Sequence, residues 1–490
     1  MKKKTFGNDF AKQNYSLLCD FYELTMGCGY LGSGMSEKTA YFDLFFRKVP
    51  DSGGFAIVAG LEQIVQYIEG LSFTPKDIEF LRHKGCFSEE FLDYLANFKF
   101  TGDIYAIPEG TPVFPGEPLI TVRAPVMQAQ LVETYLLLTL NHQSLIATKA
   151  NRIVRAAEGR PVSEFGSRRA QGVEGAILGA RAAYIGGCAG TACTISEKWF
   201  GVPAGGTMAH SWVQMFDTEY EAFDAYCTLF PDKPTLLIDT YNVLKSGLPN
   251  AIKVFKKHGI TECGIRIDSG DIAYLTKKVR KGLDEAGLTG CKIVISNSLD
   301  EYIIRDIIRQ GAQIDAFGVG ERLVTSKSDP VFGGVYKLVA VEGEGGKIIP
   351  KIKISENAGK ITTPCFKKLY RIYEKETGKA IADLICTHDE IIDPSLPLTI
   401  FDPDYTWKEK TLRNYTVEEL QKPIFIGGKR VYDLPTTDEI RAYCLEQIDR
   451  QWDEVKRFEN PHNYYVDLSR KLWDIKHELL RKASQSFENQ

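Results

Sequence analysis

The amino-acid sequence predicts an α/β fold built on a closed β/α barrel, and two observations support this prediction. Between residues 136 and 345, apolar strands of about five residues alternate with helical stretches of roughly 12 to 18 residues, a pattern typical of a parallel sheet covered by helices on both faces. Six or more such units fall within about 200 residues, which favours a closed barrel over an open sheet.

The predicted strands are short apolar runs, and they lie at 161–165, 206–209, 235–239, 264–268, 292–296 and 315–319. Helical periodicity predicts helices between them, at 168–185, 247–259 and 271–288. No GxGxxG motif follows the first strand, which disfavours a dinucleotide-binding sheet. The chain also has no Walker A motif, so any nucleotide site must be of another kind.

The flanking segments differ from this pattern. Apolar residues at helical spacing occupy 15–31, an alternating strand pattern follows at 38–50, and Pro and Gly punctuate short strands at 102–125. The last part of the chain is more polar and ends in an amphipathic helical tail at 465–486. We therefore expect three segments, which are an N-terminal mixed domain at 1–135, a barrel with active-site strand ends at 136–345 and a C-terminal segment at 346–490.

The composition is that of an ordinary globular protein, with 44% hydrophobic and 25% charged residues among 490. The net charge of −4 argues against general binding to nucleic acid or to an anionic membrane. Eleven scattered cysteines without a CxxC pair fit a reducing cytoplasm. The basic N-terminus lacks a following apolar run, and Glu133 and Arg181 interrupt the longest apolar stretches, so we expect neither a signal peptide nor a membrane span.

Polar residues, glycines and one aromatic residue follow or end the predicted strands, and they are Phe165, Arg168, His210, Asp239, Asp268, Asn297, Gly318 and Gly320. The two aspartates and the asparagine recur at intervals of 29 residues, one βα unit each. Because the carboxyl ends of barrel strands converge on one face, we expect these groups to share a site. Glycine N–H groups and arginines bind anions, while carboxylates bind Mg²⁺ or ribose hydroxyls, so the set suits a phosphorylated sugar.

Each member of this set also has a purely structural interpretation. A lone histidine such as His210 is more often a core residue, and an aspartate after a strand is often a helix cap. The residues by themselves indicate phosphosugar chemistry and leave the reaction open. They also leave open a barrel that binds phosphorylated ligands without catalysis.

Seven motifs add a resemblance that spans nearly the whole chain in order. They are CDFYELTM (19–26), EFGSRRAQG (164–172), GTMAHSW (206–212), LIDTYN (237–242), RIDSGD (266–271), FGVG (317–320) and GGVYKLV (333–339). Together they resemble the nicotinate phosphoribosyltransferase family. The resemblance implies the type II phosphoribosyltransferase fold: an irregular β/α barrel with a second mixed α+β domain formed from the N- and C-terminal segments, assembled as a homodimer with shared active sites.

The same resemblance implies an activity. Phosphoribose would pass from phosphoribosyl pyrophosphate to nicotinate, giving nicotinate mononucleotide in the first step of NAD salvage from nicotinate. Mg²⁺ would be the cofactor and ATP a co-substrate, with no tightly bound organic cofactor. His210 would couple ATP hydrolysis to the reaction as a transient phosphohistidine, since a neutral imidazole is a competent nucleophile near pH 7.

The resemblance also assigns residues to the pyridine ring. Phe165 and Tyr22 resemble the aromatic pair that sandwiches the ring, with Tyr22 coming from the partner subunit. Stacking leaves the ring free to rotate, so polar groups must orient it. Thr207 and Arg266 stand at family positions near nicotinate, and an arginine is a suitable partner for its carboxylate.

For the sugar and phosphates, the resemblance places Arg168 near the phosphorylated ribose or its pyrophosphate and Asp268 at the ribose hydroxyls. Gly318 and Gly320 match a loop that holds the 5′-phosphate. Arg47 is expected to reach phosphate across the dimer. The direct ligands of the metal are left unassigned.

Two positions depart from the family pattern. Glu321 follows the glycine loop where many relatives carry threonine, so a side-chain contact to phosphate is in doubt there. Ala192 stands where relatives that use nicotinamide carry an aspartate, and losing that carboxylate favours an acid over an amide. Nicotinamide and quinolinate phosphoribosyltransferases remain the alternatives among enzymes.

Overall fold

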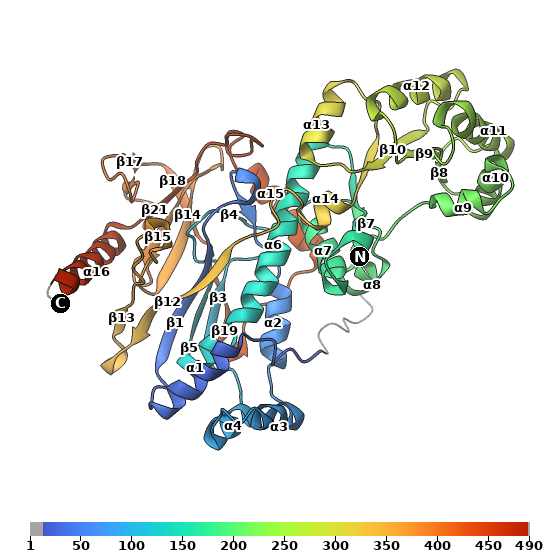
Figure 1. Cartoon of the computed structure of the whole chain (residues 1–490). Helices are drawn as coiled ribbons and strands as arrows, with labels where there is room; N and C mark the ends of the chain where they lie inside the picture. Colours follow the sequence, from blue (N-terminus) through green and yellow to red (C-terminus); the bar gives the residue numbers. More distant parts are fainter. Residues whose placement is uncertain (1–12, 489–490) are drawn as a thin grey trace. The chain divides into compact units, whose positions relative to one another are not determined.

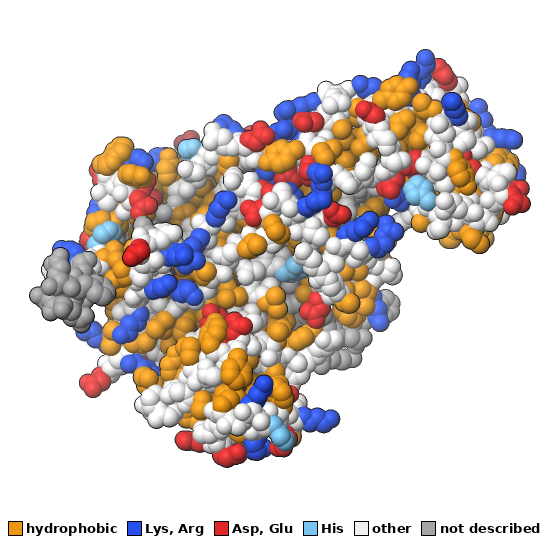
Figure 2. Space-filling model, in the orientation of Figure 1, with side chains coloured by type: hydrophobic (Ala, Val, Ile, Leu, Met, Phe, Trp, Pro, Cys, Tyr) orange, Lys and Arg blue, Asp and Glu red, His pale blue; other side chains and the backbone are white. Residues whose placement is uncertain are grey.

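The structure is a computed structural model that describes residues 13–488. Contacts divide these residues into two compact units, one formed by Ile146–Pro330 and the other by residues 13–145 with residues 331–488 (Figure 1). Most of the basic N-terminal stretch lies outside the described residues. None of the described helices is long and apolar enough to cross a membrane. Figure 2 shows acidic and basic side chains interspersed on the visible face, in line with the small net charge.

The first unit is built on a six-stranded parallel sheet in the order β7-β6-β11-β10-β9-β8. Its strands are β6 (Val162–Glu164), β7 (Gly190–Thr191), β8 (Thr235–Leu237), β9 (Gly264–Ile267), β10 (Lys292–Asn297) and β11 (Ala316–Val319). Five of the six strands predicted from the sequence are confirmed. The two-residue β7 had no prediction, because so short a strand carries no periodic signal.

The predicted strand at 206–209 is wrong. One parallel bridge, between Thr191 and Ala204, ties this part of the chain to β7, and the segment then runs without regular structure to α9 (His210–Gln214). Pro203 lacks an N–H donor and the glycines after it have little preference for an extended backbone, so a ladder does not continue. His210 therefore begins a short helix instead of ending a strand.

Helices lie between the strands in sequence, and they are α7 (Val173–Ile185), α8 (Thr194–Phe200), α10 (Glu219–Leu229), α11 (Leu248–His258), α12 (Ile272–Glu285), α13 (Glu301–Arg309) and α14 (Glu321–Val324). The three helices predicted at 168–185, 247–259 and 271–288 are confirmed, although α7 starts late. The positive φ of Gly172, 94°, separates α7 from the short 3₁₀ turn Ser167–Arg169. Asp271 caps α12 by accepting a hydrogen bond from the N–H of Tyr274 at 2.8 Å.

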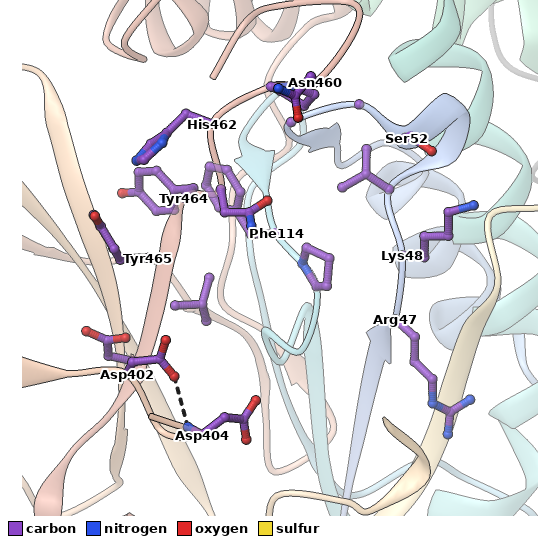
Figure 3. Close-up of a pocket in the computed structure, with 18 of the residues that line it drawn as sticks. Arg47, Lys48, Ser52, Phe114, Asp402, Asp404, Asn460, His462, Tyr464 and Tyr465 are labelled. Carbon is purple, nitrogen blue, oxygen red and sulfur yellow. Dashed lines mark hydrogen bonds between the residues drawn. The ribbon is translucent and has the colours of Figure 1, made fainter. Parts of the chain in front are cut away.

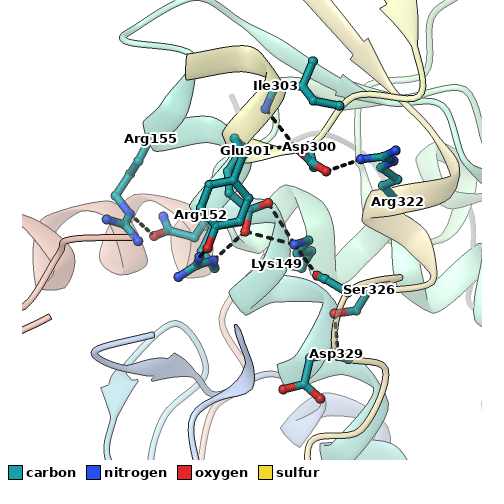
Figure 4. A network of polar contacts seen from close by, with 12 residues as sticks. Lys149, Arg152, Arg155, Asp300, Glu301, Ile303, Arg322, Ser326 and Asp329 are labelled. Atoms are coloured by element: carbon teal, nitrogen blue, oxygen red, sulfur yellow. Dashed lines mark hydrogen bonds and ion pairs between the residues drawn. The ribbon is translucent and has the colours of Figure 1, made fainter. Parts of the chain in front are cut away.

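A buried ion-pair network joins α6 (Glu133–Ala156) to α13 in this unit (Figure 4). Lys149 and Arg152, from the last turns of α6, both contact the carboxylate of Glu301, at 2.8 and 2.7 Å. All three side chains are at most 3% exposed. Arg152 also donates to the hydroxyl of Tyr302 at 3.1 Å. The Glu301 carboxylate thus pairs with two buried cations, and these ion pairs help to fix how α6 packs on α13.

We expect Glu301→Gln to destabilise the protein by about 3 kcal/mol, because two buried cations would each lose their ion pair with Glu301. Urea denaturation followed by tryptophan fluorescence measures the shift. Glu262→Gln is the matched control, since Glu262 pairs with Lys233 at 2.8 Å in an exposed ion pair. Its midpoint should equal that of the wild type. Equal midpoints for both variants would show that the buried network does not hold the helices together.

The second unit contains a seven-stranded sheet in the order β13-β12-β1-β5-β3-β19-β20 and a four-stranded sheet in the order β18-β14-β15-β21. The strands of the first are β1 (Thr39–Phe46), β3 (Asp103–Ala106), β5 (Ile120–Pro125), β12 (Gly334–Glu342), β13 (Ile348–Pro350), β19 (Lys422–Ile426) and β20 (Lys429–Arg430). The strands of the second are β14 (Lys367–Glu374), β15 (Ala380–Thr387), β18 (Tyr415–Glu419) and β21 (Tyr465–Leu468). Strands from before and after the parallel sheet pair directly, as β1 with β12 and β3 with β19 (Figure 1).

Two short two-stranded sheets complete this unit, β2 (Ala56–Ile57) with β4 (Pro112–Val113) and β16 (Leu398–Phe401) with β17 (Glu409–Leu412). The helices wholly within it are α1 (Phe21–Gly32), α2 (Leu61–Gly70), α3 (Pro75–His83), α4 (Glu89–Ala96), α5 (Val126–Leu131), α15 (Thr437–Asp449) and α16 (Arg470–Glu488). The predicted helix at 15–31 and the strand at 38–50 are confirmed as α1 and β1, although α1 begins only at Phe21 and β1 ends at Phe46. The amphipathic tail is wrong in its first residues, which form β21 before α16 begins.

Candidate active site

Arg266 organises the polar groups at the carboxyl end of the parallel sheet. It stands near the end of β9, and its Nε donates to Oγ of Ser296 on β10 at 2.6 Å. One Nη donates to Oγ1 of Thr207 at 3.2 Å, and the other donates to Oδ1 of Asp268 at 3.2 Å. A guanidinium group bound on three sides is fixed in position, so it can present a defined positive charge to a ligand.

The Phe165 ring lies directly beside this charge. Its centroid is 5.6 Å from the guanidinium carbon of Arg266. The backbone N–H of Phe165 donates to the carbonyl of Val319 at 2.8 Å, which holds the residue at the end of β6. Gly318 lies within β11, inside the strand and not in a loop after it, and a Cβ atom there would meet the ring at 2.4 Å. The missing side chain of Gly318 therefore makes room for the aromatic ring.

We expect Gly318→Ala to push the Phe165 ring out of position and to raise the KM for an aromatic substrate about tenfold, with a smaller effect on kcat. Overpacking of this kind costs roughly 1 to 3 kcal/mol. Gly290→Ala is the control, because a Cβ atom at Gly290 would have only one neighbour within 4 Å, at 3.9 Å. An unchanged KM in Gly318→Ala would contradict a role for the ring in binding.

Two aspartates form a connected carboxylate pair at the ends of β8 and β9. Oδ2 of Asp239 accepts hydrogen bonds from the backbone N–H of Asp268 at 3.0 Å and from the hydroxyl of Ser269 at 2.6 Å. Oδ1 of Asp268 accepts from the hydroxyl of Ser296 at 2.5 Å. Oδ1 of Asp239 is buried and has no hydrogen-bond partner in the described structure. That oxygen is available to a hydroxyl group or a cation of a ligand.

His210 faces this pair from the start of α9. Its Nδ1 lies 3.1 Å from the hydroxyl of Thr240, and its Nε2 lies 4.0 Å from Oδ2 of Asp268. The side chain is 41% exposed, so His210 is not the core histidine that a lone histidine more often is. Among residues 13–488, no group of three or more His, Cys, Asp or Glu side chains is placed to hold a metal ion.

Glu164, on β6 next to Phe165, is completely buried and hydrogen-bonds the turns around the site. Its carboxylate accepts hydrogen bonds from the N–H of Gly166 and from the hydroxyl of Thr191, the latter at 2.7 Å. Burial raises the pKa of this carboxyl group. The backbone carbonyl of Glu164 accepts from the N–H of Ala192 at 2.8 Å. Glu164 thus ties the turn that carries Phe165 to the turn that carries Ala192.

The remaining predicted residues of this unit lie around the same edge. Arg168 is exposed in the 3₁₀ turn after β6, and Asn297 is exposed at the end of β10, where its side chain accepts from the N–H of Ser298 at 2.6 Å. Gly320 precedes α14 as its N-terminal cap residue. Glu321 forms an ion pair with Lys327 at 2.7 Å, and this lysine lowers the pKa of the Glu321 carboxyl group.

Tyr22 and Arg47 belong to the other unit. Tyr22 is 43% exposed on α1, and burial together with the nearby carboxylate of Glu133 raises the pKa of its phenol. Arg47 lines a cavity of about 1080 Å³ together with Lys48 and His462 (Figure 3). The roles of Tyr22 and Arg47 in a shared site stay predictions.

Sequence reasoning missed Glu164 and Ser269 among the polar groups of this edge, and it missed Thr240, which contacts His210. The two hydroxyl residues Thr240 and Ser269 each directly follow a strand-end aspartate. That adjacency is the signal that could have found them.

Arg266, Phe165 and the two aspartates define an α/β protein whose sheet edge is built for an anionic ligand with an aromatic ring and hydroxyl groups. Comparison with models of known protein families identifies such a family. The N-terminal domain of nicotinate phosphoribosyltransferase matches residues 17–141, the nicotinate phosphoribosyltransferase family matches residues 161–377 and its C-terminal domain matches residues 366–476. The chain belongs to the nicotinate phosphoribosyltransferase family.

Relatives extend this match over the full length. The nicotinate phosphoribosyltransferase of Bacillus subtilis is 42% identical over 483 residues, which cover 98% of both chains. The human nicotinate phosphoribosyltransferase is 30% identical over 93% of this chain and 95% of its own. The crystal structure of human nicotinic acid phosphoribosyltransferase superposes with a TM-score of 0.84 and 29% identity over 94% of this chain and 99% of that one.

Proposed function

We propose that this protein transfers phosphoribose from phosphoribosyl pyrophosphate to nicotinate, giving nicotinate mononucleotide and pyrophosphate. The observation that carries the proposal is the Arg266–Phe165 pair, in which a fixed guanidinium group lies 5.6 Å from an aromatic ring. A flat aromatic acid needs this combination, because the ring stacks while the carboxylate pairs with the cation. Family membership supports the same reaction. The protein would then act in the cytoplasm, in the first step of NAD salvage from nicotinate.

The fold proposed for this function is an irregular β/α barrel with a second domain from the N- and C-terminal segments. Two contacts support closure of the barrel. Ala204 bridges to Thr191 on the edge strand β7, and Arg266 reaches Thr207 and the carbonyl of Met208 from β9, the neighbour of the other edge strand. The irregular segment at 204–208 therefore contacts both β7 and β9, toward opposite edges of the parallel sheet. The homodimer is also part of the proposal.

Within this proposal, nicotinate lies against Phe165, with Tyr22 of the partner subunit on its other face and Thr207 near its edge. Arg266 binds the carboxylate. Ala192 supports the acid over the amide, because no carboxylate stands there to repel nicotinate or to accept from an amide N–H.

Asp268 binds the ribose hydroxyls, since its side chain is already oriented by Arg266 and Ser296. Arg168 binds the pyrophosphate, and the backbone N–H groups around Gly320 bind the 5′-phosphate. Glu321 is kept from this phosphate by its ion pair with Lys327. The reaction builds up negative charge on the departing pyrophosphate, so the proposed catalysis is mainly electrostatic stabilisation by Arg168 and the N–H groups.

The residues present fit a bound Mg²⁺. Mg²⁺ commonly takes one or two carboxylates and completes its shell with water and phosphate oxygens. Oδ1 of Asp239 is a buried carboxylate oxygen without a partner, and Asp268 lies beside it. These two residues would hold the ion, which when bound neutralises the charge of the leaving pyrophosphate.

ATP is the proposed co-substrate, and His210 is the proposed acceptor of its terminal phosphate. The exposed imidazole at the mouth of the site supports this role, since a nucleophile must be reachable. No tightly bound organic cofactor is needed for this chemistry.

A comparison of pyridine substrates tests the proposal. With phosphoribosyl pyrophosphate, Mg²⁺ and ATP present, we expect nicotinate to be used at least tenfold better than nicotinamide, and quinolinate not to be used. A preference for nicotinamide or quinolinate would assign the protein to one of the alternative reactions. Binding of phosphoribosyl pyrophosphate without turnover of any pyridine would indicate a non-catalytic protein.

A further inference from the structure

We propose that Thr240 is a positioning residue for His210, whose hydroxyl holds Nδ1 and directs Nε2 toward the phosphate of ATP. The inference rests on the proposed function, because it assigns an atom and an orienting partner to the phosphorylation of His210. Thr240 follows Asp239 in the turn after β8, whereas the histidine is the first residue of α9.

The two nitrogens of His210 have different surroundings. Nδ1 is within hydrogen-bond distance of the Thr240 hydroxyl, at 3.1 Å. Nε2 is 4.0 Å from Oδ2 of Asp268, which is too long for a hydrogen bond. A nitrogen already engaged with a hydroxyl group is a poor nucleophile, so the geometry singles out Nε2 as the reactive atom.

Apart from Thr240, the local structure constrains the imidazole of His210 only weakly. It belongs to the first residue of α9, a helix of five residues, and it is 41% exposed. The residue before it, Ala209, has no polar side chain and does not cap the helix. A ring at the end of a short helix can rotate about χ1 and χ2, so one hydrogen bond from the turn after β8 fixes its orientation.

The hydroxyl of Thr240 suits this role because a hydroxyl group can both accept and donate a hydrogen bond. Because it can accept from Nδ1–H, it keeps the proton on that nitrogen and leaves the Nε2 lone pair free. Nε2 then forms a bond to the terminal phosphorus of ATP, and the bond between that phosphorus and the ADP oxygen breaks with its electron pair leaving on ADP. The Nδ1 proton stays on the ring, which becomes cationic and continues to donate to Thr240.

The test compares Thr240→Val with Thr240→Ser. Valine has nearly the same shape without a hydroxyl group, whereas serine keeps it. With ATP labelled in its terminal phosphate, we expect Thr240→Val to form acid-labile phosphoenzyme about tenfold more slowly, the size of one lost hydrogen bond. Thr240→Ser should restore most of the rate, and both variants should transfer phosphoribose without ATP at the wild-type rate. In the wild-type phosphoenzyme, the phosphate should be on Nε2.

Thr228→Val is the matched control, since the Thr228 hydroxyl donates to the carbonyl of Asp224 at 2.8 Å within α10. Its phosphorylation rate should be that of the wild type. Wild-type phosphorylation in Thr240→Val, failure of Thr240→Ser to restore the rate, or phosphate on Nδ1 would each overturn the inference. Absence of phosphoenzyme in the wild type would instead refute the proposed coupling to ATP. If Thr240→Val does not fold, Thr240→Ala replaces it with the same expected rates.

Discussion

Replacing His210 with asparagine is expected to abolish the ATP-dependent part of the reaction and to leave a weak transferase that is indifferent to ATP. Asparagine preserves a polar side chain of similar reach but has no nucleophilic nitrogen. The groups proposed to act in the displacement itself, Arg266 and Asp268, remain in place. The measurements are phosphoenzyme formation from labelled ATP and product formation with and without ATP.

His258→Asn is the control for that experiment. His258 lies in the same unit at the end of α11 and contacts Asp224 at 2.7 Å, away from the sheet's carboxyl edge. We expect this variant to form phosphoenzyme and to respond to ATP as the wild type does. If His210→Asn still coupled ATP hydrolysis to product formation, the assignment of His210 would be wrong.

Arg266→Gln is expected to lower kcat/KM for nicotinate by roughly 10³-fold, about 4 kcal/mol of transition-state stabilisation. Glutamine removes the charge that faces the carboxylate, and it also loosens Thr207, Ser296 and Asp268, which Arg266 now holds together. The loss should be greater for nicotinate than for nicotinamide, because only the acid depends on the positive charge. The ratio of the two kcat/KM values measures this directly.

Arg280→Gln is the matched control for this variant. The Arg280 side chain is 18% exposed, close to the 15% of Arg266, and it donates to Asp284 and to the carbonyls of Leu288 and Cys291. This variant should lose some stability and keep its substrate preference. An equal loss of activity toward nicotinate and nicotinamide in Arg266→Gln would contradict recognition of the carboxylate by Arg266.

Much of the parallel sheet could be predicted, because its strands carry their own signal. The apolar runs before Asp239 and Asp268 formed β8 and β9, and the interval of 29 residues placed both aspartates at one edge, where they are in contact. Arg266 and Phe165 came together as the resemblance implied. For the strands and the two aspartates, a local pattern and the rule that parallel strands end on one side were sufficient, whereas the pairing of Arg266 with Phe165 also needed the family resemblance.

The rest depended on tertiary contacts that no local pattern contains. The segment at 206–209 has small residues like those of a strand end, yet Pro203 and the glycines after it allow only one bridge to β7. The place of Gly318 under the Phe165 ring depends on the pairing of β6 with β11. The contact of Thr240 with His210 joins the turn after β8 to a helix 30 residues earlier, and its spacing has no periodic signature.

The most direct test of the central claim is the formation of nicotinate mononucleotide from nicotinate and phosphoribosyl pyrophosphate, measured with and without ATP. We expect the product to form under both conditions, with a higher rate and a more complete conversion when ATP is present and ADP released alongside. Turnover that is identical with and without ATP would contradict the proposed coupling. No nicotinate mononucleotide under either condition would contradict the proposed function itself.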